Sequence, residues 1–148
     1  MLSRSARLRR ADEGQSLVEF ALILPVILLT VFGIIDLARA VWEENTLAYA
    51  AREGTRYAIV HGSAGTPPVT AADTTLIVNV VKNAAVGVPN ITVTVNWPDT
   101  NGPTTCYDRN CRVSVDATAP FIPLPSQYLL NGAFTINLRG GSMLVIQR

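Results

Sequence analysis

An apolar run from Leu17 to Ile35 constrains this chain more than any other feature. Only Glu19 and Thr30 are polar in its 19 residues, which also include Pro25 and the small Gly33. At about 1.5 Å per residue a helix of this length is roughly 28 Å long, close to the roughly 30 Å hydrocarbon core of a bilayer. A core helix of a small soluble domain would show a polar face, which this run lacks. The run therefore predicts a single transmembrane helix.

The distribution of charge predicts how this helix is oriented. Arg4, Arg7, Arg9 and Arg10 precede the run closely, and the next basic residue is Arg39. The positive-inside rule places the arginine-rich N-terminus in the cytoplasm and the rest of the chain outside it. The formal net charge is only +1, which gives no indication of a nucleic-acid partner.

Glu19 is unusual because it lies inside the apolar run. A carboxylate costs on the order of 2.5–3.5 kcal/mol at mid-membrane and less near the interface, so a partner or a role is expected. Glu19 lies five residues after Gly14. A cut after Gly14 would make Gln15 the first residue, and its α-amino group, with a pKa of about 7.7–8.0, would be largely cationic. That group could pair with Glu19 of the same chain or of a neighbouring subunit.

This arrangement of a basic leader, a glycine, a glutamate five residues later and a long apolar helix resembles the processing signal of type IV prepilins. The string GQSLVEFALILPVILL, then Gly33, Asp36, Ala38-Arg39 and AAREGTRYA at residues 50–58, is similar to the TadE-like family. That family comprises small pseudopilins of tight-adherence (Flp) pilus systems, and the resemblance covers residues 14–62.

The resemblance implies a membrane-anchored minor pilin or pseudopilin with a structural role in assembling an adhesive pilus. A prepilin peptidase would cut between Gly14 and Gln15, and Glu19 would be the carboxylate read during processing and assembly. The implied partners are the major pilin, sister pseudopilins, the pilus assembly platform and membrane lipid. The implied location is the cell membrane, and three positions stay open: the tip of a pilus, its shaft, or retention in the membrane.

Four segments are predicted: a cytoplasmic leader (1–14), a transmembrane helix (15–35), an amphipathic stalk helix (36–62) and an extracytoplasmic head (63–148). The stalk carries apolar residues at helical spacings, namely Leu37, Val41, Leu47, Ala48, Ala51 and Ala58. Ala50, Ala51 and Gly54 form a strip of small residues where another element could approach closely. A continuous helix is predicted from Ser16 to His61, ended by the glycines and prolines that follow it.

The head sequence predicts α+β structure. Residues 70–85 favour a second, short helix capped by Thr70 or Asp73, although their paired β-branched residues also suit a strand. Residues 91–97 and 112–118 alternate apolar and polar and predict an antiparallel pair around a turn-rich connection at 99–103. Residues 120–131 are interrupted by prolines and predict apolar anchors without regular structure. Residues 134–138 and 142–146 predict one or two further strands, divided by Gly140-Gly141. A long helix carrying such a small antiparallel sheet is similar to the pilin layout.

Cys106 and Cys111 are separated by four residues in the predicted extracytoplasmic head. In that compartment the pair predicts a disulfide that closes a small loop, stabilising by on the order of 2 kcal/mol. Zinc is disfavoured because His61 is the only histidine in the sequence.

The sequence contains no arrangement of residues typical of an enzyme. His61 lies at a predicted helix end and is interpreted as structural, and there is no phosphate-binding glycine loop. The expectation is a protein that is not an enzyme and binds neither metal nor cofactor.

Two alternatives stay open: a permanently anchored extracytoplasmic binding module with an uncleaved N-terminus, and a secreted protein released after Ala40. The apolar run is longer than the 7–15 residues of a signal peptide, which disfavours release.

Overall fold

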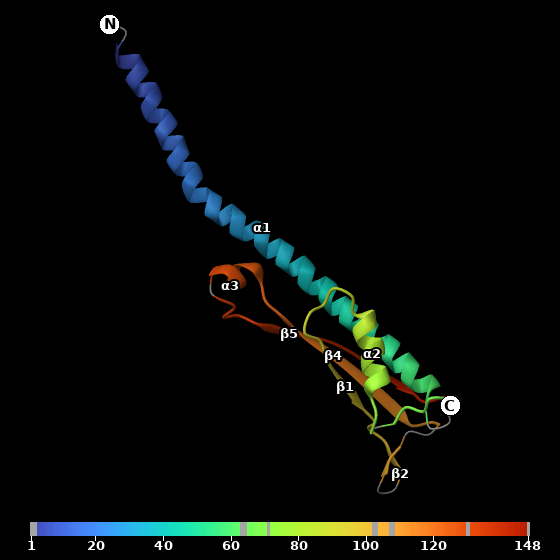
Figure 1. The fold of residues 1–148 in the computed structure, drawn as a ribbon. Coiled ribbons are helices and arrows are strands. Elements are labelled where there is room, and N and C mark those ends of the chain that lie inside the picture. Colours follow the sequence, from blue (N-terminus) through green and yellow to red (C-terminus); the bar gives the residue numbers. More distant parts are fainter. Residues whose placement is uncertain are drawn as a thin grey trace.

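The computed structural model describes residues 3–62, 65–70, 72–101, 104–106, 109–129 and 131–147. One long helix carries a small head along its C-terminal half (Figure 1). The elements, in chain order, are α1 (Ser3–Val60), α2 (Thr75–Ala84), β1 (Thr92–Asn96), β2 (Thr100–Asn101), β3 (Thr104–Thr105), β4 (Arg112–Phe121), α3 (Leu124–Leu129) and β5 (Ile136–Val145). The predicted α+β fold, a long N-terminal helix with a small antiparallel sheet, is confirmed.

Helix α1 runs without interruption from the leader through the apolar run into the head. It begins at Ser3, before the predicted start at Ser16, and ends at Val60, one residue before the predicted end. It contains Pro25, and the helix changes direction in its blue, N-terminal half (Figure 1). Proline lacks the amide proton of the helical ladder and its ring crowds the preceding turn, which accounts for a bend rather than a break.

The main sheet has three antiparallel strands in the order β1-β4-β5. The predicted pairing of the two alternating runs is confirmed, with Val95 opposite Val115. Strand β4 is central, and its inward positions are all buried: Val113, Val115, Ala117, Ala119 and Phe121. Strand β5 forms a single strand through Gly140-Gly141, which decides between the one or two strands predicted there. Helix α1 packs on β4, β5 and α2, so the core lies between the helices and the sheet.

The prediction that residues 120–131 lack regular structure is wrong. Strand β4 continues through Pro120, opposite Asn137 of β5, and Leu124–Leu129 form α3. The β1 pairing ends at Thr118, so Pro120 lies where β4 has a neighbour on one side only, a position that tolerates proline. Pro125 lies in the first turn of α3, where a missing amide proton is not needed by the helix.

Two smaller elements also differ from prediction. Helix α2 is confirmed as a helix, but it starts at Thr75 rather than Thr70. The Asp73 carboxylate accepts the backbone N–H of Thr75 at 3.0 Å, so Asp73 serves the N-terminus of this helix. The turn-rich connection contains a short hairpin, β2–β3, that the sequence pattern did not indicate.

Asp99 and Arg112 join the two ends of the connection that holds this hairpin. The Asp99 carboxylate accepts the Arg112 backbone N–H at 2.6 Å and its guanidinium at 2.7 Å. These hydrogen bonds from Arg112 hold the pKa of Asp99 below its usual range.

The strip of small residues on α1 is where the head packs, as predicted. Ala50, Ala51 and Gly54 are buried. A Cβ on Gly54 would collide with the Val81 side chain of α2. A Cβ on Gly140 of β5 would collide with the backbone of Leu47 and Ala48. Of the apolar stalk positions, Leu37 and Val41 are exposed, because they lie on another side of α1.

Replacing Gly140 with alanine tests this contact. We expect G140A to destabilise the head by about 3 kcal/mol, since the added methyl group meets helix backbone that cannot rotate away. Urea unfolding of the full chain in detergent micelles, followed by circular dichroism, measures the effect. The control is G141A, whose methyl group meets only the movable Asp116 side chain. Equal stability of the two variants would contradict the proposed packing.

Candidate functional site

The three predicted processing residues lie close together on α1. Gln15 Nε2 donates a hydrogen bond to Glu19 Oε1 at 3.1 Å, and both side chains are exposed. A Cβ built on Gly14 would meet nothing within 4 Å. Gly14, Gln15 and Glu19 therefore form an open surface without cover from the head.

The helical spacing determines which groups can lie beside the Glu19 carboxylate. Gln15 and Glu19 are four residues apart, so their side chains lie on the same face of α1. A helix beginning at Gln15 would present its positive dipole end and a new amino group beside the Glu19 carboxylate. Among the side chains that the structure describes, no cation forms an ion pair with Glu19. Its partner in the intact chain is the neutral Gln15 amide.

Beyond this surface, apolar side chains surround α1 on all sides. All residues from 14 to 35 are exposed, whereas the apolar core helix of a soluble protein is buried. Within the described residues, α1 is the single helix long and apolar enough to cross a membrane. This part of α1 needs an apolar environment that the head does not supply.

A cluster of charged residues marks the end of the apolar run. Asp36 and Glu43 are only 7% and 6% exposed. Arg39 lies between them, with its guanidinium 3.3 Å from Asp36 Oδ1 and 3.7 Å from Glu43 Oε1. Both ion pairs follow from the helical spacing in the sequence, but their burial does not.

This cluster also connects α1 to the head. The backbone N–H of Leu124, the first residue of α3, donates to Asp36 Oδ2 at 2.8 Å. The Arg39 guanidinium lies over the Phe121 ring, 5.3 Å from its centroid. Sequence reasoning missed these contacts, which join residues about 85 positions apart. An Asp directly after an apolar run was the one available signal.

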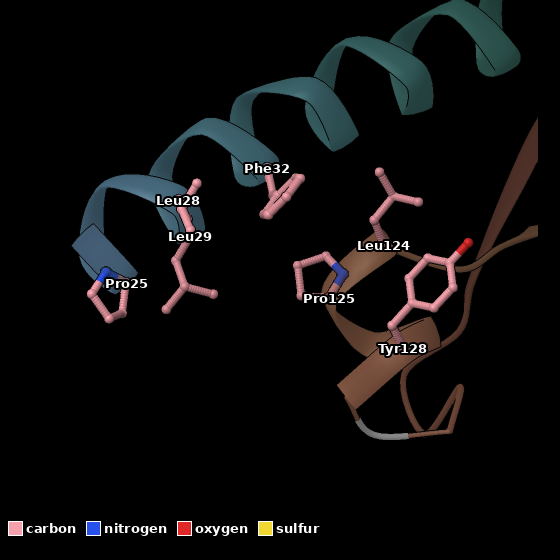
Figure 2. Close-up of a pocket in the computed structure, with 7 residues that line it drawn as sticks. All are labelled: Pro25, Leu28, Leu29, Phe32, Leu124, Pro125 and Tyr128. Carbon is pink, nitrogen blue, oxygen red and sulfur yellow. The ribbon is translucent and has the colours of Figure 1, made fainter. Parts of the chain in front are cut away.

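An apolar cleft lies between α1 and α3 (Figure 2). Its volume is about 480 Å³. Helix α1 contributes Pro25, Leu28, Leu29 and Phe32 to its walls, and α3 contributes Leu124, Pro125 and Tyr128. No sequence pattern indicated this cleft, because the prediction for residues 120–131 contained no helix.

The remaining predicted residues lie elsewhere in the head. Cys106 and Cys111 are at disulfide distance, with Cα atoms 5.9 Å apart. His61 Nδ1 is 3.0 Å from the Tyr57 carbonyl oxygen, and its ring stacks on that of Tyr57. Over the described part of the chain, no three His, Cys, Asp or Glu residues gather where they could hold a metal ion.

Replacing Asp36 with alanine tests the connection between α1 and α3. We expect D36A to cost about 1–3 kcal/mol, because the Leu124 N–H loses its acceptor and Arg39 loses one buried partner. Hydrogen exchange of the full chain in micelles should show faster exchange at the Leu124 amide. The matched control is E44A, which removes an exposed acid on the same helix. Unchanged exchange at Leu124 would argue against this role of Asp36.

Residues 14–56 match the family model described as TadE-like protein. The match starts at Gly14 and ends within α1, so it includes the apolar run and the charged cluster but not the sheet. Comparison with curated proteins and with solved structures found no match. The predicted resemblance is confirmed for this segment. In this segment, which is less than half of the chain, the protein is similar to the TadE-like family.

Proposed function

We propose that this protein is a minor, non-catalytic subunit of a tight-adherence pilus, a pseudopilin anchored in the cell membrane by α1. The observation that carries the proposal is the exposed apolar segment of α1, which starts beside Gly14 and Glu19 and which the head leaves uncovered. A helix of this kind requires lipid before assembly and other apolar helices after it.

Processing is the first step of the proposed function. The leader arginines hold the N-terminus on the cytoplasmic side of the membrane. A prepilin peptidase then cuts between Gly14 and Gln15. Glycine suits the position before the cut, because a residue without a Cβ is easily drawn out of the helix into an extended conformation.

Assembly is the second step. The cut leaves the neutral Gln15 side chain beside Glu19 and creates cationic α-amino groups, one of which, on a neighbouring subunit, pairs with the Glu19 carboxylate. Such a pair is stronger in a low-dielectric helix bundle than in water, although desolvation opposes part of the gain. Major pilin and sister pseudopilins supply the helices, and the assembly platform in the membrane brings them together. Since α1 is one continuous helix, the head moves with it.

A structural role also agrees with how the charged groups of the head are used. Asp99 pairs with Arg112 at 2.7 Å, and Asp116 pairs with Arg139 at 2.9 Å, each between neighbouring segments of the fold. The cluster around Arg39 holds α3 and β4 against α1. These groups have structural partners, and we propose no catalytic function for them.

The mature N-terminus tests the processing step. Mass spectrometry of the protein purified from its native membrane should find a first peptide that begins at Gln15. The variant G14I should remain uncut, because its bulky side chain fills space beside the scissile bond that glycine leaves open to the peptidase. The control G33I, at another open glycine of α1, should be processed normally. A wild-type peptide beginning at Met1 would instead support an anchored binding module, and one beginning at Val41 a secreted protein.

Replacing Glu19 tests the assembly step. We expect E19A and E19Q to be lost from the pilus fraction while the thermal unfolding of the head is unchanged, because only the exposed carboxylate is altered. E19Q keeps the size of the side chain and removes its charge. E44A, which alters an exposed acid beyond the apolar run, should assemble like the wild type. Normal processing and assembly of E19A would refute the role given to this carboxylate.

A further inference from the structure

The position of the cleft along α1 indicates the depth at which α3 lies relative to the membrane. Of the α1 residues of the cleft, Leu28, Leu29 and Phe32 belong to the C-terminal half of the apolar run, the half nearer the head, and Pro25 lies next to the midpoint of the run. Phe32 lies three residues before the end of the run, which is about 5 Å along the helix axis. If α1 spans the bilayer as proposed, α3 lies beside it at the depth of the outer-leaflet acyl chains rather than in water.

The sequence around α3 fits that depth. From Ala117 to Leu138 the chain has no Asp, Glu, Lys or Arg. Tyr128 is 77% exposed, and Phe134 and Ile136, in the segment that follows α3, are exposed as well. Tyrosine is enriched where proteins meet the membrane interface, because its ring is apolar and its hydroxyl remains hydrogen-bonded. The charged groups of the head lie outside this uncharged segment.

Four backbone N–H groups in and after α3 are paired within the protein. The Leu124 N–H is bonded to Asp36, and the Gln127 N–H to the Pro123 carbonyl at 2.9 Å. The Ser126 hydroxyl accepts the Phe134 N–H at 3.0 Å, and the Gly132 N–H donates to the Ser126 carbonyl at 2.8 Å. Internal pairing of this kind is what a hydrocarbon environment requires, since an unpaired backbone group there costs several kcal/mol.

The size and continuity of the cleft indicate its occupant. Its walls are apolar, and they continue the exposed surface of α1 that faces lipid in the anchored protein. A helix from another subunit is about 10–12 Å across with its side chains, so a cleft of about 480 Å³ would hold only roughly 4–6 Å of its length unless α3 moves away. A single acyl chain is much narrower than a helix and matches walls that are apolar on both sides, with Leu29 and Phe32 of α1 on one side and Pro125 of α3 on the other (Figure 2).

We infer that this cleft holds an acyl chain of an outer-leaflet lipid, and that α3 is a second membrane contact of the head. The inference rests on the proposed anchoring of α1 in the membrane. In this arrangement α3 limits how deeply the head enters the membrane. The lipid must leave the cleft when α1 moves from the membrane into the pilus.

Photo-cross-linking in lipid nanodiscs tests this inference on the full chain. The probe is a phosphatidylcholine that carries a diazirine in the middle of one acyl chain, and mass spectrometry maps the modified residues. We expect cross-links on residues 17–35 of α1 and on Leu124–Leu129, and none around Met143 of β5, an exposed residue in the part of the head away from α3.

A charged substitution provides the variant for this test. Y128D should lose the cross-links on α3 and keep those on α1, because a carboxylate at the cleft disfavours the acyl chain. The matched control is V86D, at another exposed apolar residue of the head, which should keep both sets. Circular dichroism of both variants verifies that the fold is intact.

The other outcomes separate this inference from the proposed anchoring. Cross-links on α1 without any on α3 would overturn the acyl-chain site and leave the anchoring in place. Absence of cross-links on α1 as well would overturn the anchoring, and the inference with it. Attachment of α3 to a second copy of the chain, or α3 cross-links that persist in Y128D, would also overturn the lipid as occupant.

Discussion

The close contact between α1 and β5 determines the arrangement of this protein, because it lets one helix serve both the membrane segment and the core of the head. At Gly140 the strand approaches the backbone of Leu47 and Ala48 with no side chain between them. The small residues of α1 around this point bring the sheet and α2 against the same helix. The core of the head is completed by α1, which contributes Leu47, Ala50, Ala51 and Ala58 to it, so the small head depends on this helix.

The charged cluster at the end of the apolar run adds a second attachment. Asp36 and Glu43 are largely withdrawn from water, whereas the Arg39 side chain that pairs with them is 41% exposed. Buried charges are tolerated when each has a partner and a hydrogen bond. Here the carboxylate of Asp36 has both, one on α1 and one on α3. The position of α3 beside the apolar run follows from that contact. The cleft inferred to hold lipid therefore depends on a residue outside the run itself.

Patterns of neighbouring residues predicted the elements that depend mainly on neighbouring residues. The α2 helix, the pairing of β1 with β4 and the long α1 helix all follow from periodicity and turn residues, and all are present. Residues 120–131 show the opposite case. Their prolines argue against regular structure, yet Pro120 is accommodated by the end of the β1 pairing and α3 by a carboxylate on a distant helix. The two glycines of β5 likewise look like a break, but one of them is required by the approach of α1.

The sequence alone determined the apolar run, the charge asymmetry around it, the Gly14–Glu19 spacing and the similarity of residues 14–56 to the TadE-like family, because each depends on neighbouring residues along one helix. It also determined which strand positions face inward, since alternation has a period of two. The tertiary structure alone decided that Gly140 meets the α1 backbone, that Asp36 binds the start of α3, and that an apolar cleft opens beside Phe32. These features join residues far apart in the chain, and the free energy of such contacts depends on shape and burial, which no local pattern records.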